Sequence, residues 1–79
     1  MPDARTTVLD AIGAIVARRI EVDLHVEVRA ESDLYDDLEL DSLEVLELSG
    51  ALEDGLGRDP FTEGLAPRTV AEVIRFYEA

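Results

Sequence analysis

The sequence of 79 residues contains no cysteine, no tryptophan and no lysine, and it has a single histidine. Without cysteine the chain forms neither disulfides nor cysteine-ligated metal sites, so any thiol chemistry needs a thiol brought in from outside. No apolar run approaches the roughly 20 residues that cross a membrane, and the N-terminus lacks the basic and apolar regions of a secretory signal. These absences predict a cytoplasmic protein that does not contact membranes.

The charge is strongly one-sided, with 19 acidic residues against 7 basic ones and a formal net charge of −12. A surface this negative repels phosphate backbones and anionic lipids, which excludes nucleic acid as a partner and favours proteins with basic surfaces. Yet 47% of the residues are hydrophobic, too many for a disordered acidic tail. The composition predicts one folded domain over residues 1–79, most simply a monomer.

Hydrophobic spacing predicts a first helix over Thr6 to Arg19, and then the pattern changes. From Ile20 to Val28 apolar and polar residues alternate, as in a strand. Because no second alternating run exists to pair with it, we expect an extended loop that inserts alternate side chains between helices.

Capping signals mark the later helices. Asp41 followed by Glu44 resembles a capping box and opens a second helix, which glycines at 55 and 57 should end. Its core stripe is predicted to comprise Val45, Leu48 and Leu52.

The connector from Pro60 to Pro67 is predicted to contain one short helical turn near Thr62 to Leu65. Thr69 and Glu72 form a second capping box, opening a last helix. The buried face of this helix is expected to comprise Val70, Val73, Ile74 and Tyr77. The predicted fold is all-α, a small four-helix bundle with three main helices, a short third helix and a long loop between helices 1 and 2.

An acidic segment holds the candidate site. There is no basic residue between Arg29 and Arg58, and in the middle of that stretch lies Asp41-Ser42-Leu43. This run resembles the phosphopantetheine attachment motif of acyl carrier proteins, whose core is Asp-Ser-Leu at the start of the second helix. The resemblance extends over nearly the whole chain, although the family usually has glycine where this chain has Glu39.

The resemblance implies a free-standing, non-catalytic carrier of acyl or polyketide intermediates in fatty acid or polyketide biosynthesis. Ser42 would bear 4'-phosphopantetheine, transferred from coenzyme A by a phosphopantetheinyl transferase, and Asp41 would cap the helix and help present Ser42. The resemblance also implies that basic patches on a ketosynthase and other biosynthetic enzymes bind the second helix. The expected partner contacts are Leu43, Glu44, Leu46, Glu47 and Glu53.

Two other functions remain open. An aminoacyl or peptidyl carrier would use the same arm, though the absence of glycine in Leu38-Glu39-Leu40 argues mildly against it. An unmodified acidic helical adaptor would need no arm at all. An autonomous enzyme is disfavoured, because no histidine or lysine near Ser42 in the sequence can activate it.

Other polar and aromatic residues receive no functional role. Asp33, Asp36, Asp37 and Asp41 lack the ligand spacing of a calcium loop, so no metal is expected. His25 is expected on the solvated side of the loop. The aromatic residues are interpreted as packing residues: Tyr35, Phe61, Phe76 and Tyr77.

Overall fold

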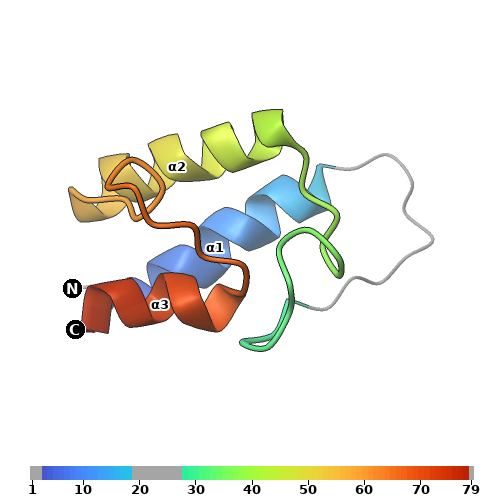
Figure 1. Cartoon of the computed structure of the whole chain (residues 1–79), viewed down its shortest axis with the longest axis horizontal. Helices are drawn as coiled ribbons and strands as arrows, with labels where there is room; N and C mark the ends of the chain where they lie inside the picture. The colour runs from blue at the N-terminus through green and yellow to red at the C-terminus, as the bar shows by residue number, and fades with distance from the viewer. Residues whose placement is uncertain (1–2, 19–27, 79) are drawn as a thin grey trace.

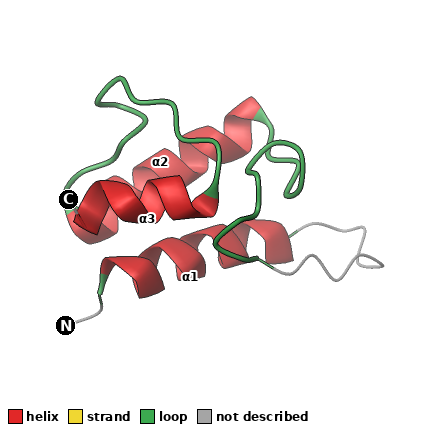
Figure 2. Cartoon of the chain, turned by 60° about the horizontal axis from the view of Figure 1, so that its bottom comes forward, coloured by secondary structure: helices red, strands yellow, loops and turns green. Residues whose placement is uncertain are grey.

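The computed structural model describes residues 3–18 and 28–78, which form three helices joined by loops (Figure 1). They are α1 (Ala4–Ala17), α2 (Ser42–Leu56) and α3 (Val70–Glu78). Helix α2 runs back against α1, and α3 packs beside α1, so the start of α1 and the end of α3 lie at the same end of the molecule. The described residues contain helices and loops but no strand (Figure 2), which confirms an all-helical fold.

Helix α1 begins earlier than its hydrophobic pattern suggested. Asp3 caps it, because its carboxylate accepts a hydrogen bond from the Thr6 N–H at 2.8 Å. Val8, Ile12 and Ile15 form its buried stripe. The predicted end at Arg19, most of the alternating segment from Ile20 to Val28, and His25 lie outside the described residues.

The described part of the first loop, residues 28–41, is held against the beginning of α3 by backbone hydrogen bonds. The Leu34 N–H donates to the Arg68 carbonyl at 2.7 Å, and the Val70 N–H donates to the Ser32 carbonyl at 3.1 Å. These bonds place the leucines that precede α2 over the helices. The loop thereby closes one side of the core.

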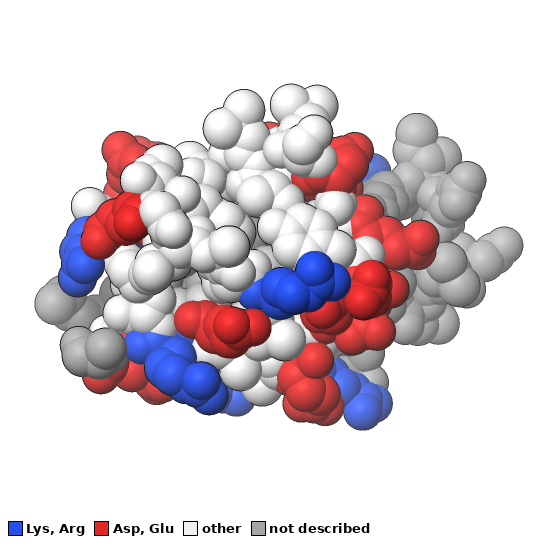
Figure 3. Space-filling view, in the orientation of Figure 1, with Lys and Arg blue, Asp and Glu red and all other residues white. Residues whose placement is uncertain are grey.

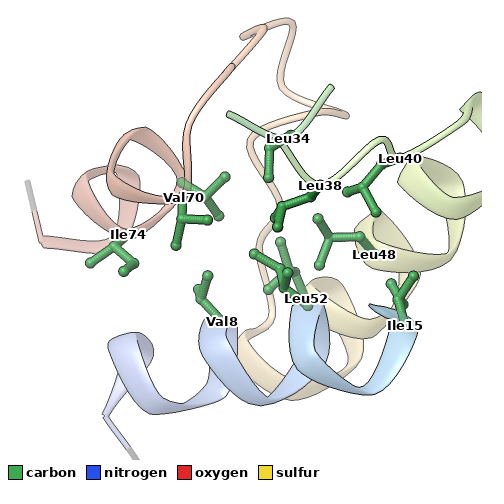
Figure 4. Packing of buried hydrophobic residues seen from close by; sticks show 11 residues of the cluster. Val8, Ile15, Leu34, Leu38, Leu40, Leu48, Leu52, Val70 and Ile74 are labelled. Carbon is green, nitrogen blue, oxygen red and sulfur yellow. The ribbon is translucent and has the colours of Figure 1, made fainter. Parts of the chain in front are cut away.

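The core is a single cluster drawn from all three helices and this loop (Figure 4). Leu48 and Leu52 of α2 are fully buried, and Val45 packs against the cluster from a half-buried position, which confirms the predicted stripe. The other buried members are Val8, Ile12, Ile15, Leu34, Leu38, Leu40, Val70, Val73 and Ile74.

The short third helix was predicted wrongly, because the connector from 60 to 64 forms a turn. The Leu65 N–H donates to the Pro60 carbonyl at 3.1 Å, and Gly64 adopts φ +84°, a left-handed conformation that stops helical propagation. Of the two glycines expected to end α2, Gly55 lies inside the helix. Gly57, at φ +78°, forms its left-handed cap.

Helix α3 has the predicted capping box. The Glu72 N–H donates to Thr69 Oγ1, and the Thr69 N–H donates to Glu72 Oε1, each at 3.2 Å. Val70, Val73 and Ile74 are buried as expected. Tyr77 is half-buried, and its hydroxyl donates to the Arg58 carbonyl at 2.7 Å. Burial raises the pKa of Tyr77 to about 12, and the nearby Asp59 carboxylate adds to the rise.

Candidate functional site

The N-terminus of α2 is fixed by a complete capping box. Asp41 has an extended backbone (φ −90°, ψ 177°), and its carboxylate accepts a hydrogen bond from the Glu44 N–H at 2.8 Å. In return, Glu44 Oε1 accepts from the Asp41 N–H at 3.1 Å. Both halves of the predicted capping box are therefore present, and the first helical turn is held by side chains.

Ser42 is the first residue of α2, and its side chain is exposed. The Glu44 N–H donates to the Asp41 carboxylate, and the Val45 N–H donates to the Asp41 backbone carbonyl. Among the described residues, no acceptor is paired with the N–H groups of Ser42 or Leu43. Such unpaired donors and the positive end of the helix dipole favour an anion. An exposed hydroxyl beside two open donors fits the phosphodiester that phosphopantetheine attachment would create.

The chain approaches Ser42 through a tightly held loop. Leu38 and Leu40 are buried, and the Leu40 N–H donates to the Leu34 carbonyl at 2.9 Å. Between them, Glu39 is exposed and adopts φ +53°, the left-handed region that favours glycine. Glycine, which the resemblance leads one to expect at this position, would adopt this conformation readily. The departure from the family pattern was the only signal in the sequence that could have predicted it.

The carboxylates considered for calcium are engaged in loop contacts. Asp33 Oδ1 accepts from the N–H groups of Tyr35 and Asp36, each at 2.8 Å, and Asp37 Oδ2 accepts from the Asp33 N–H at 2.7 Å. The Asp36 N–H is the main cause of the lowered pKa of Asp33, and Arg68 contributes further. Across residues 3–18 and 28–78, no three His, Cys, Asp or Glu side chains lie close enough together to hold a metal ion.

Tyr35 and Arg68 form an exposed pair on this loop. The Arg68 guanidinium lies 5.3 Å from the centroid of the Tyr35 ring, and its Nε is 3.2 Å from Asp33 Oδ2. Tyr35 remains 39% exposed. It therefore stacks against an arginine at the surface and does not fill the core.

The residues expected to contact partners lie mostly at the surface of α2. Leu43 and Leu46 are 63% and 67% exposed, the largest values among the exposed large hydrophobic residues. Glu47 and Glu53 are exposed, whereas Glu44 is half-buried and shared with the cap. Near the beginning of α2 and its preceding loop, acidic side chains gather at the right of the view (Figure 3). We call Leu43, Glu44, Leu46 and Glu47 the α2 face.

The middle of α2 holds a buried polar contact that the sequence did not predict. Ser49 of α2 donates a hydrogen bond to Asp59 Oδ2 in the connector, and Asp59 is only 1% exposed. The second oxygen of this carboxylate accepts from the Phe61 N–H at 3.0 Å. The contact joins the middle of α2 to the connector.

A groove of about 600 Å³ lies between the connector and α3. Leu65, Pro67 and Phe76 line it with apolar side chains, and Arg58 and Arg75 line it as well. The Arg58 guanidinium lies 4.7 Å from the centroid of the Phe76 ring. The groove does not include Ser42 or any residue of the α2 face.

None of the three described helices is both long enough and apolar enough to cross a membrane.

Comparison with known proteins identifies the family. Residues 10–76 match the family model described as the phosphopantetheine attachment site. The chain is 37% identical over 71 residues to an acyl carrier protein of Helicobacter hepaticus, covering 89% of this chain and 92% of that protein. It is 35% identical over 75 residues to an acyl carrier protein of Prochlorococcus marinus, covering 91% of this chain and 90% of that protein. No solved structure gives a significant match. The chain therefore belongs to the acyl carrier protein family, whose members are non-catalytic carriers that bear phosphopantetheine.

Proposed function

We propose that Ser42 bears the phosphopantetheine arm and that this carrier holds acyl intermediates of fatty acid or polyketide synthesis. The observation that carries the proposal is the exposed Ser42 hydroxyl at the first position of a capped helix, within Asp41-Ser42-Leu43. The open N–H groups of Ser42 and Leu43 favour the phosphodiester there. The arm supplies the thiol that this cysteine-free chain lacks, and with it a thioester link to the cargo.

Asp41 acts as a positioning residue in this proposal. Its carboxylate is committed to the Glu44 N–H, so it holds the first turn of α2 in place beneath Ser42. It does not activate the serine. Activation belongs to the phosphopantetheinyl transferase, and Ser42 needs only to be exposed and correctly placed.

The α2 face and Glu53 would receive the basic surfaces of the transferase and of the biosynthetic enzymes. Two exposed leucines provide apolar contact beside carboxylates, and Ser42 lies on the same helix. Exposed charges of this kind govern orientation and association rate more than affinity. Short-lived complexes suit a carrier that visits several enzymes in turn.

Intact-protein mass spectrometry tests the attachment residue directly. The purified protein is incubated with coenzyme A, magnesium and a broad-specificity phosphopantetheinyl transferase, and Ser42→Ala is treated in parallel. We expect the parent to gain the mass of one phosphopantetheine and Ser42→Ala to gain none. Both proteins should show the same helical circular dichroism, so that lack of loading cannot be ascribed to unfolding.

A second step on the loaded protein separates the kinds of cargo. Malonyl transferase with malonyl-coenzyme A should add mass to the arm, while aminoacyl-adenylating enzymes with their amino acids and ATP should not. Loading by the second set alone would favour the aminoacyl carrier. Failure of several transferases to modify the folded parent would overturn the carrier function of Ser42 and favour the unmodified adaptor.

A further inference from the structure

An arginine from α1 reaches the α2 face. The Arg18 guanidinium forms an ion pair with the Glu47 carboxylate, which joins the end of α1 to α2. The Arg18 backbone is held at the end of α1, where its N–H donates to the Ile15 carbonyl at 3.3 Å. The guanidinium is therefore presented to Glu47 from a fixed backbone position.

This ion pair lies where partner cations are expected to bind. Glu47 follows Leu43 by one helical turn, so the carboxylate is a neighbour of an exposed leucine near Ser42. The Arg18 and Glu47 side chains are 60% and 40% exposed, so both are accessible to an approaching protein. Arg18 Nη2 contacts Glu47 Oε2, so a partner arginine that forms a bidentate pair with both oxygens of this carboxylate must compete with Arg18 for Oε2.

We propose that Arg18 is a specificity-determining residue that competes with partner cations for Glu47 and so weakens docking on the α2 face. The inference rests on the proposed function, in which this face receives basic enzymes. An exposed ion pair contributes little free energy, so the competition should change partner affinity by about two- to fivefold. A competitor of this strength shortens complexes without preventing them. It would also favour partners that offer more than one cation to the face.

The chain offers a closely matched control. Arg58 forms a second exposed ion pair with Glu63 at the opposite end of α2, and these side chains are 62% and 41% exposed. Arg58→Gln and Arg18→Gln each remove one positive charge from an exposed pair, so they change the net charge of the molecule equally. Only Arg18→Gln releases a carboxylate on the α2 face. Any difference between the two variants therefore reports the position of the cation and is independent of total charge.

The experiment measures KM and kcat of a phosphopantetheinyl transferase for the unmodified carrier at low ionic strength. We expect Arg18→Gln to lower KM by about two- to fivefold with kcat unchanged, and Arg18→Lys to restore the parent value. Arg58→Gln should shift KM by less. In a Glu47→Gln background, Arg18→Gln should no longer lower KM, because the carboxylate for which Arg18 and the partner cation compete is absent. A purely structural role for Arg18 would instead lower the unfolding midpoint and leave KM without this dependence on Glu47.

Other results would overturn the inference. They include an unchanged or raised KM in Arg18→Gln, a shift equal to that of Arg58→Gln, and an effect that persists without Glu47. If the parent is loaded but shows one of these results, the inference alone fails. If the transferases never load the folded parent, the proposed function fails and the inference fails with it.

Discussion

At the residue scale, Glu39 is the clearest case of a side chain in a backbone conformation that suits another residue. Glu39 has φ +53° and lies between the buried residues Leu38 and Leu40, whose packing fixes the path of the chain on both sides. A left-handed conformation costs a residue with a Cβ about 1–2 kcal/mol, whereas glycine adopts it readily. The neighbouring packing therefore holds Glu39 in a conformation that it would otherwise disfavour.

Glycine at this position should give a more stable fold than alanine. We expect Glu39→Gly to be more stable than Glu39→Ala by about 1 kcal/mol, because both remove the carboxylate but only glycine relieves the left-handed strain. Urea unfolding followed by circular dichroism measures the difference. Equal midpoints for the two variants would mean that the loop relaxes and that φ at this position carries no strain.

Ser49 and Ser42 show how differently two serines of one helix behave. Ser49 is 7% exposed and donates to the buried Asp59, while Ser42 is exposed at the surface. A buried carboxylate that loses a hydrogen-bond donor retains the cost of its desolvation. The same chemical change should therefore have unequal consequences at the two positions.

Ser49→Ala should lower the free energy of unfolding by about 1–3 kcal/mol, since it leaves the buried Asp59 with fewer donors. Ser42→Ala is the matched control, and it should shift the free energy by no more than about 0.5 kcal/mol. Chemical denaturation of both variants in one buffer makes the comparison. A Ser49→Ala protein as stable as Ser42→Ala would show that the connector does not depend on this contact.

At the scale of elements, what the sequence predicted correctly was local. Both capping boxes, Asp41 with Glu44 and Thr69 with Glu72, depend on residues three apart, so the spacing alone identified them. The core stripes followed from helical periodicity. The start of α1 was predicted late because the cap at Asp3 precedes the apolar pattern by several residues.

What the sequence did not predict depends on contacts between distant segments. Ser49 in the middle of α2 pairs with Asp59 ten positions later in the connector, and Arg18 pairs with Glu47 across 29 positions of chain. Neither pairing has a periodic signature. The absent third helix has a similar origin, because Gly64 and the hydrogen bonds around Asp59 hold the connector in a turn. Within the candidate site, the motif and the cap were predicted, whereas the left-handed backbone of Glu39 was not, although glycine is usual at this position in the family that the sequence resembles.

At the scale of the whole molecule, a net charge of −12 should dominate encounters with basic enzymes. Raising NaCl from about 50 mM to about 500 mM reduces the Debye length severalfold, so KM of a basic partner for the carrier should rise by about tenfold. Steady-state kinetics with the transferase measures this, and kcat should change little. The Glu47→Gln/Glu53→Gln variant should show a flatter dependence on salt. A KM independent of salt would imply that leucine contacts alone govern recognition.

The arrangement of the helix ends bears on how such a carrier can be held. The start of α1 and the end of α3 lie at one end of the molecule, and α2 begins at the other (Figure 1). An attachment made through either terminus, whether a linker, a tag or a solid support, would therefore join the side remote from Ser42. The serine would project outward from the anchor in both cases, so immobilised or fused forms of this protein should remain open to the enzymes that load it.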